Sequence, residues 1–135
     1  MTAYAAAFLA VLVVFAGIDL AWIALVMRAL FAQHLGPLLV ESPRLGPAIA
    51  FYLVYAAGIV LLAVLPAQSW PMGRLAALGF GAALGLVAYA TYDLTNRATL
   101  KAWPLSVALV DIAWGTLLTA LAALAGHAVL EWMKR

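Results

Sequence analysis

Four long apolar runs are the feature of this sequence that most limits what it can fold into. They cover residues 3–27, 47–65, 75–96 and 104–130, and charged residues or prolines separate them. Each run is close to or above the ~20 residues with which an α-helix crosses the core of a bilayer. None of them alternates polar and apolar side chains as the strands of a membrane barrel do. The sequence therefore predicts an all-α fold, a four-helix transmembrane bundle that forms a single domain over residues 1–135.

The composition excludes several other classes of protein. Hydrophobic residues make up 69% of the chain and charged residues 9%, whereas soluble domains have roughly 45–50% and 25%. Such a chain has too little polar surface for a cytosolic, secreted or nucleic-acid-binding protein. It has no cysteine, so disulfides, thiolate metal sites and cysteine nucleophiles are excluded. Its Lys and Arg residues, seven in all, form no cluster, and we expect no nucleic acid partner.

Four membrane crossings place both termini on one side of the membrane. The connection at 68–74 shares that side, and the long connection at 28–46 and the short one at 97–103 lie on the other. We expect the first run to be a retained helix rather than a cleaved signal peptide, because it is long and Asp19 interrupts it. Basic residues are nearly balanced across the membrane, so the orientation and a dual topology stay open. They are Arg28, Arg44, Arg97 and Lys101 on the loop side, and Arg74, Lys134 and Arg135 on the side of the termini.

Small and aromatic residues indicate how the helices pack and where they end. Gly81 and Gly85 form a small-xxx-small pair in the third run, as do Ala122 and Gly126 in the fourth, and such pairs let membrane helices approach closely. Tryptophans near the ends of the runs are expected in the aromatic belt at the membrane surface. These are Trp70, Trp103 and Trp132.

Three of the five acidic residues lie inside the apolar runs. They are Asp19, Asp93 and Asp111. A carboxylate in hydrocarbon costs at least ~2.5–3.5 kcal/mol, so such residues usually face the bundle interior and mark function. A rise of 1.5 Å per residue places them roughly 12, 5 and 11 Å below the loop-side boundary. The sequence therefore predicts a one-sided intramembrane pocket with these three aspartates as candidate catalytic residues.

Aromatic and polar residues gather in the same half of the predicted bundle. Tyr89, Asp93 and Asn96 follow one another at i, i+4 and i+7 on one helix face. The pattern aliphatic-Asp-aliphatic-Ala-Trp occurs at 18–22 and again at 110–114, in helices of opposite direction, and inverted repeats recur around membrane binding sites. The candidate substrate-binding residues are Trp22, Tyr52, Tyr55, Tyr89, Tyr92, Asn96 and Trp114.

Several strings resemble a bacterial family catalogued as domain of unknown function 2177. The resemblance spans nearly the whole chain, with one minor departure, Ala90, where the family is expected to have Gly. It implies a four-helix protein of the bacterial inner (cytoplasmic) membrane. It also directs the substrate class toward lipids, since we associate such genes with neighbours for fatty-acyl modification. The strings are DLAW at 19–22, FYLVYAAG at 51–58, ATYDLTN at 90–96, LKAWP at 100–104 and VDIAWG at 110–115.

Binding or modifying a lipid-like substrate in one leaflet is the function that these residues favour, with membrane lipids as partners. Paired carboxylates beside an apolar wall can divide into an acid and a base. Asp93 and Asn96 are the candidate ligands if Mg²⁺ or another hard cation is bound. No nucleotide is expected. No haem is expected either, because His34 lies in the long loop and His127 in the opposite half of the membrane, too far apart to form a ligand pair. Each lone histidine is expected to be solvated or hydrogen-bonded.

Two alternative functions stay open at this point. The protein could be a proton-coupled or small-cation-coupled transporter that works as a homo-oligomer, because three buried acids require a counter-charge. It could also be a structural or accessory membrane subunit in which the aspartates hold helices together by hydrogen bonds. Interhelical hydrogen bonds in membranes average only ~0.6 kcal/mol. The stability gained from such bonds is therefore a weak reason to bury three acids.

Overall fold

The computed structural model of the protein describes residues 1–36 and 39–135. This described part contains four continuous helical spans and no strand, and the mean hydropathy of the spans ranges from 1.6 to 2.6. The predicted all-α, four-helix transmembrane fold is thus confirmed. The spans are α1 (Thr2–Trp22) with the π-helical turn η1 (Ile23–Met27) and α2 (Arg28–Leu35); α3 (Leu45–Ile59) with the π-helical turn η3 (Val60–Val64) and α4 (Leu65–Ala67); α5 (Gly73–Thr99); and α6 (Leu105–Met133).

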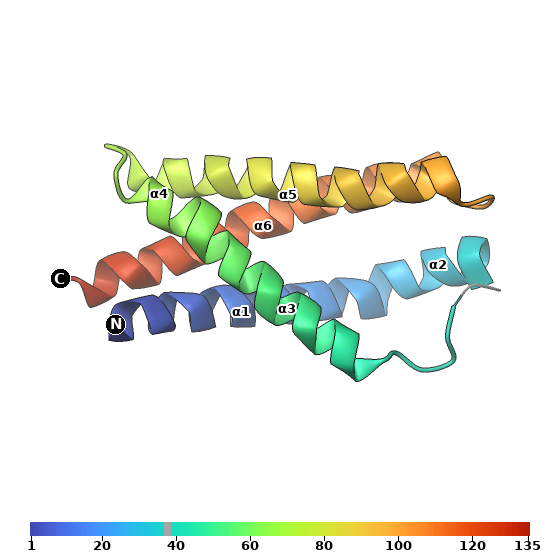
Figure 1. Cartoon of the computed structure of the whole chain (residues 1–135), viewed down its shortest axis with the longest axis horizontal. Helices are drawn as coiled ribbons and strands as arrows, with labels where there is room; N and C mark the ends of the chain where they lie inside the picture. The colour runs from blue at the N-terminus through green and yellow to red at the C-terminus, as the bar shows by residue number, and fades with distance from the viewer. Residues whose placement is uncertain (37–38) are drawn as a thin grey trace.

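Helix α6 is the centre of the bundle. Helices α5 and α1 both pack along it, and the span from α3 to α4 crosses them at a steep angle (Figure 1). The two termini lie at the same end, as predicted for four crossings (Figure 1). Half of the most apolar stretch of α6 is buried, against 17% for the first span and for α5. Residues of α6 therefore make up much of the buried interior.

The first span is longer than the sequence interpretation placed it. We predicted that it ends at Met27, but the helix continues through the eight residues of α2 to Leu35. The segment from Arg28 to Leu35 contains neither Gly nor Pro, and the first helix-breaking pair in the sequence is Gly36-Pro37. The long connection predicted at 28–46 is shorter as a result, and its residues 37 and 38 lie outside the described part.

The other spans extend two or three residues past the predicted ends at most positions, which is the usual uncertainty of helix boundaries. The second span is instructive, because the sequence predicted its end at Leu65, directly before a proline. The structure carries it through Pro66 to Ala67. Proline lacks an N–H and its ring clashes with the carbonyl four residues earlier. The turn before it, η3, is π-helical, and this wider hydrogen-bonding pattern gives the ring room.

Close approach of α5 and α6 depends on glycine. A Cβ atom at Gly81 would lie 2.7 Å from the Cβ of Ala123, and one at Gly85 would lie 2.5 Å from the carbonyl oxygen of Gly115. Neither contact is tolerable, so the backbones can pack this closely only without those side chains. The predicted packing role of the Gly81–Gly85 pair is confirmed.

The outer surface of the bundle is apolar. Large side chains that point outward remain widely exposed in all parts of the first three spans, for example Val13 (69%), Leu25 (80%), Val54 (73%) and Val87 (64%). A surface of this kind is costly in water and is suited to the hydrocarbon of a bilayer.

Candidate functional site

A pocket of about 450 Å³ opens in the half of the bundle that holds the long loop. Its walls come from the first span, α3 and α5, and α6 closes one side. Two carboxyl groups line it, and the other lining side chains are aromatic or aliphatic. The lining residues are Asp19, Trp22, Ile23, Met27, Phe31, Phe51, Tyr55, Ala88, Tyr89, Tyr92 and Asp111.

Asp19 ties three helices together at this pocket. Only 6% of the residue is exposed. Its Oδ2 accepts a hydrogen bond of 2.8 Å from the hydroxyl of Tyr52 on α3. Its Oδ1 accepts a longer one, 3.4 Å, from the indole Nε1 of Trp114 on α6. Tyr52 and Trp114 do not themselves line the pocket, and their hydrogen bonds hold the Asp19 carboxyl in place.

The two aliphatic-Asp-aliphatic-Ala-Trp segments meet face to face. The indole rings of Trp22 and Trp114 stack with centroids 4.2 Å apart and planes inclined by 11°. The π-helical turn η1 follows Trp22 directly, and its residues Ile23 and Met27 form part of the pocket wall. Single π-helical turns occur frequently at functional sites, where they re-aim side chains.

Asp93 lies behind the pocket wall and is completely buried. Its Oδ1 accepts a hydrogen bond of 3.1 Å from Nε1 of Trp103, whose carbonyl in turn accepts one of 2.9 Å from Nη1 of Arg97. The prediction that Trp103 belongs to the aromatic belt is wrong, since only 8% of it is exposed. Its ring packs against Phe31 and Tyr92 inside the bundle. A buried carboxylate that needs a donor explains this inward orientation.

Asp93 and Asp111 form a pair of carboxyl groups. Asp93 on α5 and Asp111 near the start of α6 are neighbours whose charges interact. Within the described part of the chain, Oδ2 of Asp93 meets no donor. Two carboxylates have no proton to bond with, so the pair is satisfied when the two groups share a single proton. Asp111 therefore links the buried Asp93 to the open pocket.

The remaining predicted site residues divide into two groups. Tyr55, Tyr89 and Tyr92 line the pocket; the Tyr55 hydroxyl is 3.0 Å from Oγ1 of Thr119. The ring of Tyr89 lies directly over Gly115, at a position that any side chain there would occupy. Asn96 is only partly buried and lies outside the lining. The described residues contain no group of three or more His, Cys, Asp or Glu side chains suited to a metal, so the hard-cation ligands remain a prediction.

Together, the fold and the pocket define an integral membrane protein whose interior presents carboxyl groups on an aromatic wall. The sequence belongs to the family of predicted membrane proteins called DUF2177, whose model matches residues 4–128. The resemblance inferred from the sequence is thereby confirmed. No curated protein and no solved structure matches the chain.

Proposed function

We propose that the protein binds a lipid-like molecule from one leaflet of the bacterial inner membrane and holds its head against Asp19 and Asp111. The observation that carries this proposal is the make-up of the pocket, in which the two carboxyl groups are set into an otherwise aromatic and aliphatic wall. Its volume of about 450 Å³ falls within the ~300–1,000 Å³ of small-molecule sites. The apolar wall suits an acyl or isoprenoid tail.

The charges of the pocket limit the head of the bound molecule. Its described lining contains acidic side chains and no Lys or Arg. An anionic head would be repelled, whereas a head with hydroxyl or ammonium groups would donate hydrogen bonds to the carboxyls. Aromatic rings also attract cations through their faces. The site therefore favours an amphiphile whose head is cationic or rich in hydroxyl groups.

The Asp93–Asp111 pair gives the site a means of moving a proton. If the two groups share one proton, Asp111 can deliver it to the head of a bound molecule, which leaves both carboxyls ionised, or take a second proton from the head, which leaves both neutral. A hard cation such as Mg²⁺ bound at this pair would supply the counter-charge in a different way. In both cases the bound molecule lies at Asp111. Proton transfer would modify it, whereas a bound cation would only hold it.

Transport through a single chain has less support than binding from one leaflet. The buried core that separates the pocket from the ends of the chain is apolar, apart from the Tyr55–Thr119 pair, throughout the described residues. Val11, Leu118 and Ala122 are completely buried there. A proton or cation would have to cross this layer without polar partners, at a cost of several kcal/mol.

Lipid profiling of a deletion strain tests the proposal. The strain is complemented with the wild-type gene, with Asp111→Asn, or with Glu41→Gln as a matched acid that is exposed in the loop. We expect the deletion to change a class of amphiphile with a cationic or hydroxyl-rich head. The wild-type gene and Glu41→Gln should restore the profile, and Asp111→Asn should not. An unchanged profile in the deletion, or full restoration by Asp111→Asn, would contradict the proposal.

A further inference from the structure

A second pocket, the terminal pocket, lies at the opposite end of the bundle, where the chain begins and ends. Its volume is about 370 Å³. It is bordered by the connection between α4 and α5 and by the last turns of α6. Its lining residues are Gln68, Trp70, Pro71, Gly73, His127, Glu131, Lys134 and Arg135.

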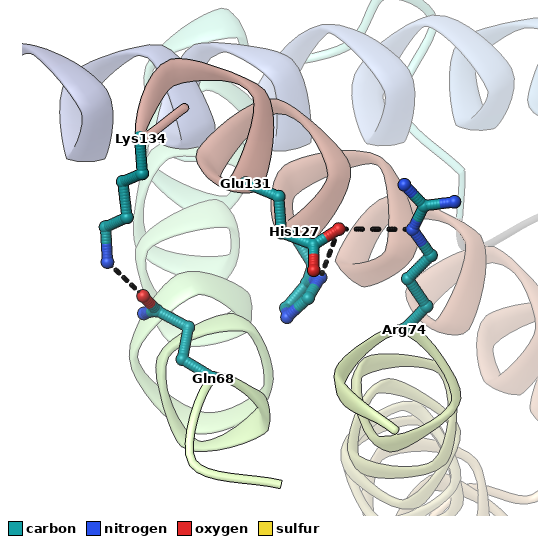
Figure 2. Close-up of polar contacts among 5 residues, drawn as sticks. All are labelled: Gln68, Arg74, His127, Glu131 and Lys134. Carbon is teal, nitrogen blue, oxygen red and sulfur yellow. Dashed lines mark hydrogen bonds and ion pairs between the residues drawn. The ribbon is translucent and has the colours of Figure 1, made fainter. Parts of the chain in front are cut away.

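His127 is the buried polar group of the terminal pocket. The residue is 1% exposed, and its Nδ1 has no hydrogen-bond partner in the described part of the chain. Oε2 of Glu131 is 3.8 Å away, too far for a hydrogen bond but within reach of an ion pair when the imidazole is protonated (Figure 2). The prediction that this histidine is solvated or hydrogen-bonded stays a prediction, since its side chain borders the terminal pocket. In the protonated ring, Nδ1 faces the carboxylate of Glu131 and Nε2 is left to donate a hydrogen bond to a bound group.

The other donors of the pocket come from the start of α5. A Cβ atom at Gly73, its first residue, would lie 2.8 Å from Nε2 of His127, so glycine allows the imidazole to lie against this helix end. The N-cap Met72 makes no side-chain capping bond, and the first turn contains no acidic residue. The first N–H groups of a helix lack partners within it and carry partial positive charge. This combination is a common site for anions.

The ionic side chains around the pocket are also suited to an anion. Glu131, the one acid among the described lining side chains, accepts a hydrogen bond of 3.1 Å from Nε of Arg74 (Figure 2). Its charge is thereby compensated. Lys134 donates a hydrogen bond to Gln68 across the pocket mouth (Figure 2), and Arg135 contributes to the lining. The basic side chains thus outnumber the acid.

We propose that the terminal pocket binds a phosphate group, and that its source is the head of an anionic phospholipid in the leaflet on the side of the termini. The phosphate oxygens would accept from the first N–H groups of α5, from Nε2 of His127 and from Lys134. Trp70 and Trp132, at the same end, are 58% and 71% exposed. Exposed indoles at helix ends mark the level of lipid head groups. This site is separate from the pocket lined by Asp19 and Asp111, which we call the acid-lined pocket. The terminal pocket favours an anion, whereas the acid-lined pocket favours a cationic or hydroxyl-rich head.

Isothermal titration of the purified full chain in a neutral detergent tests this proposal. The titrants are dihexanoyl phosphatidylglycerol, dihexanoyl phosphatidylcholine and inorganic phosphate. Lys134→Gln removes an exposed donor of the site, and Lys101→Gln removes a lysine that is also exposed, at the other end. Gly73→Ala moves the imidazole, and circular dichroism reports whether each variant is folded.

We expect phosphatidylglycerol to bind more tightly than phosphatidylcholine. Lys134→Gln should weaken binding by roughly fivefold or more, as expected for loss of a charge-assisted hydrogen bond. Gly73→Ala should also weaken it, and Lys101→Gln should leave it unchanged. Inorganic phosphate that binds as tightly as the lipid would support the phosphate site but overturn the lipid as its source. The whole proposal fails if no phosphate compound binds, or if Lys134→Gln and Lys101→Gln weaken binding equally.

Discussion

Replacing Asp93 with asparagine separates a chemical role of this carboxyl from a purely structural one. Asparagine keeps an oxygen that can accept from Nε1 of Trp103, now 3.1 Å from Oδ1. Its amide nitrogen can donate to the carboxyl of Asp111. The hydrogen bond from Trp103 and the contact with Asp111 are therefore preserved, and the free energy of unfolding should change by less than about 1 kcal/mol. Asp93→Leu leaves the indole N–H of Trp103 buried without a partner and should cost about 1–3 kcal/mol.

Asp93→Asn should abolish function although it leaves stability nearly unchanged. The substituted amide cannot share or transfer a proton with Asp111, so Asp93→Asn should fail to restore the lipid profile of the deletion strain although it is folded. Stability is measured by titrating the protein in mixed micelles with sodium dodecyl sulfate and following helicity by circular dichroism. The reasoning is refuted if Asp93→Asn is as unstable as Asp93→Leu, or if it restores the profile in full.

Two further predictions concern the hydrogen bond at Asp19 and the packing of α5. Tyr52→Phe removes the 2.8 Å hydrogen bond to Asp19 and should lower the unfolding free energy by about 0.6–1.7 kcal/mol; Tyr4→Phe, on an exposed tyrosine, should have no effect in the same titration. Gly85→Ala places a Cβ 2.5 Å from a backbone oxygen of α6 and should cost about 1–3 kcal/mol. Gly79→Ala, with nothing within 4 Å, should be neutral or slightly stabilising, and equal effects of the two glycine variants would disprove the packing account.

Much of the fold could be predicted from the sequence, because membrane spans are limited by physics that acts locally. A run of apolar residues long enough to cross the bilayer must be helical, since its backbone has no water to bond with. The depths of Asp19 and Asp111 followed from the constant rise of a helix, and both do line one pocket. The predicted end of the first span was wrong because hydropathy does not set it. The helix continues until it reaches a helix-breaking Gly-Pro pair.

The contacts of individual side chains were harder to predict. Trp103 has the position of a membrane-surface tryptophan, and only the tertiary fold shows that Asp93 needs its N–H. His127 was predicted to be an ordinary interfacial histidine, and its close contact with Gly73, which is far away in the sequence, was not foreseen. The rotation of a helix about its axis decides such contacts, and a chain in which nearly every residue is apolar gives little indication of it.

Photolabelling with matched amphiphiles tests the central claim most directly. The probes are single-chain diazirine lipids that differ only in an ammonium or a phosphate head. We predict that the ammonium probe labels residues 22–31 and 51–55 and that the phosphate probe does not. Ala88→Phe, which fills the acid-lined pocket, should abolish this labelling, while Ala83→Phe on the exposed face of α5 should preserve it. Labelling that is confined to the outer surface, or that is equal for both heads, would contradict the account.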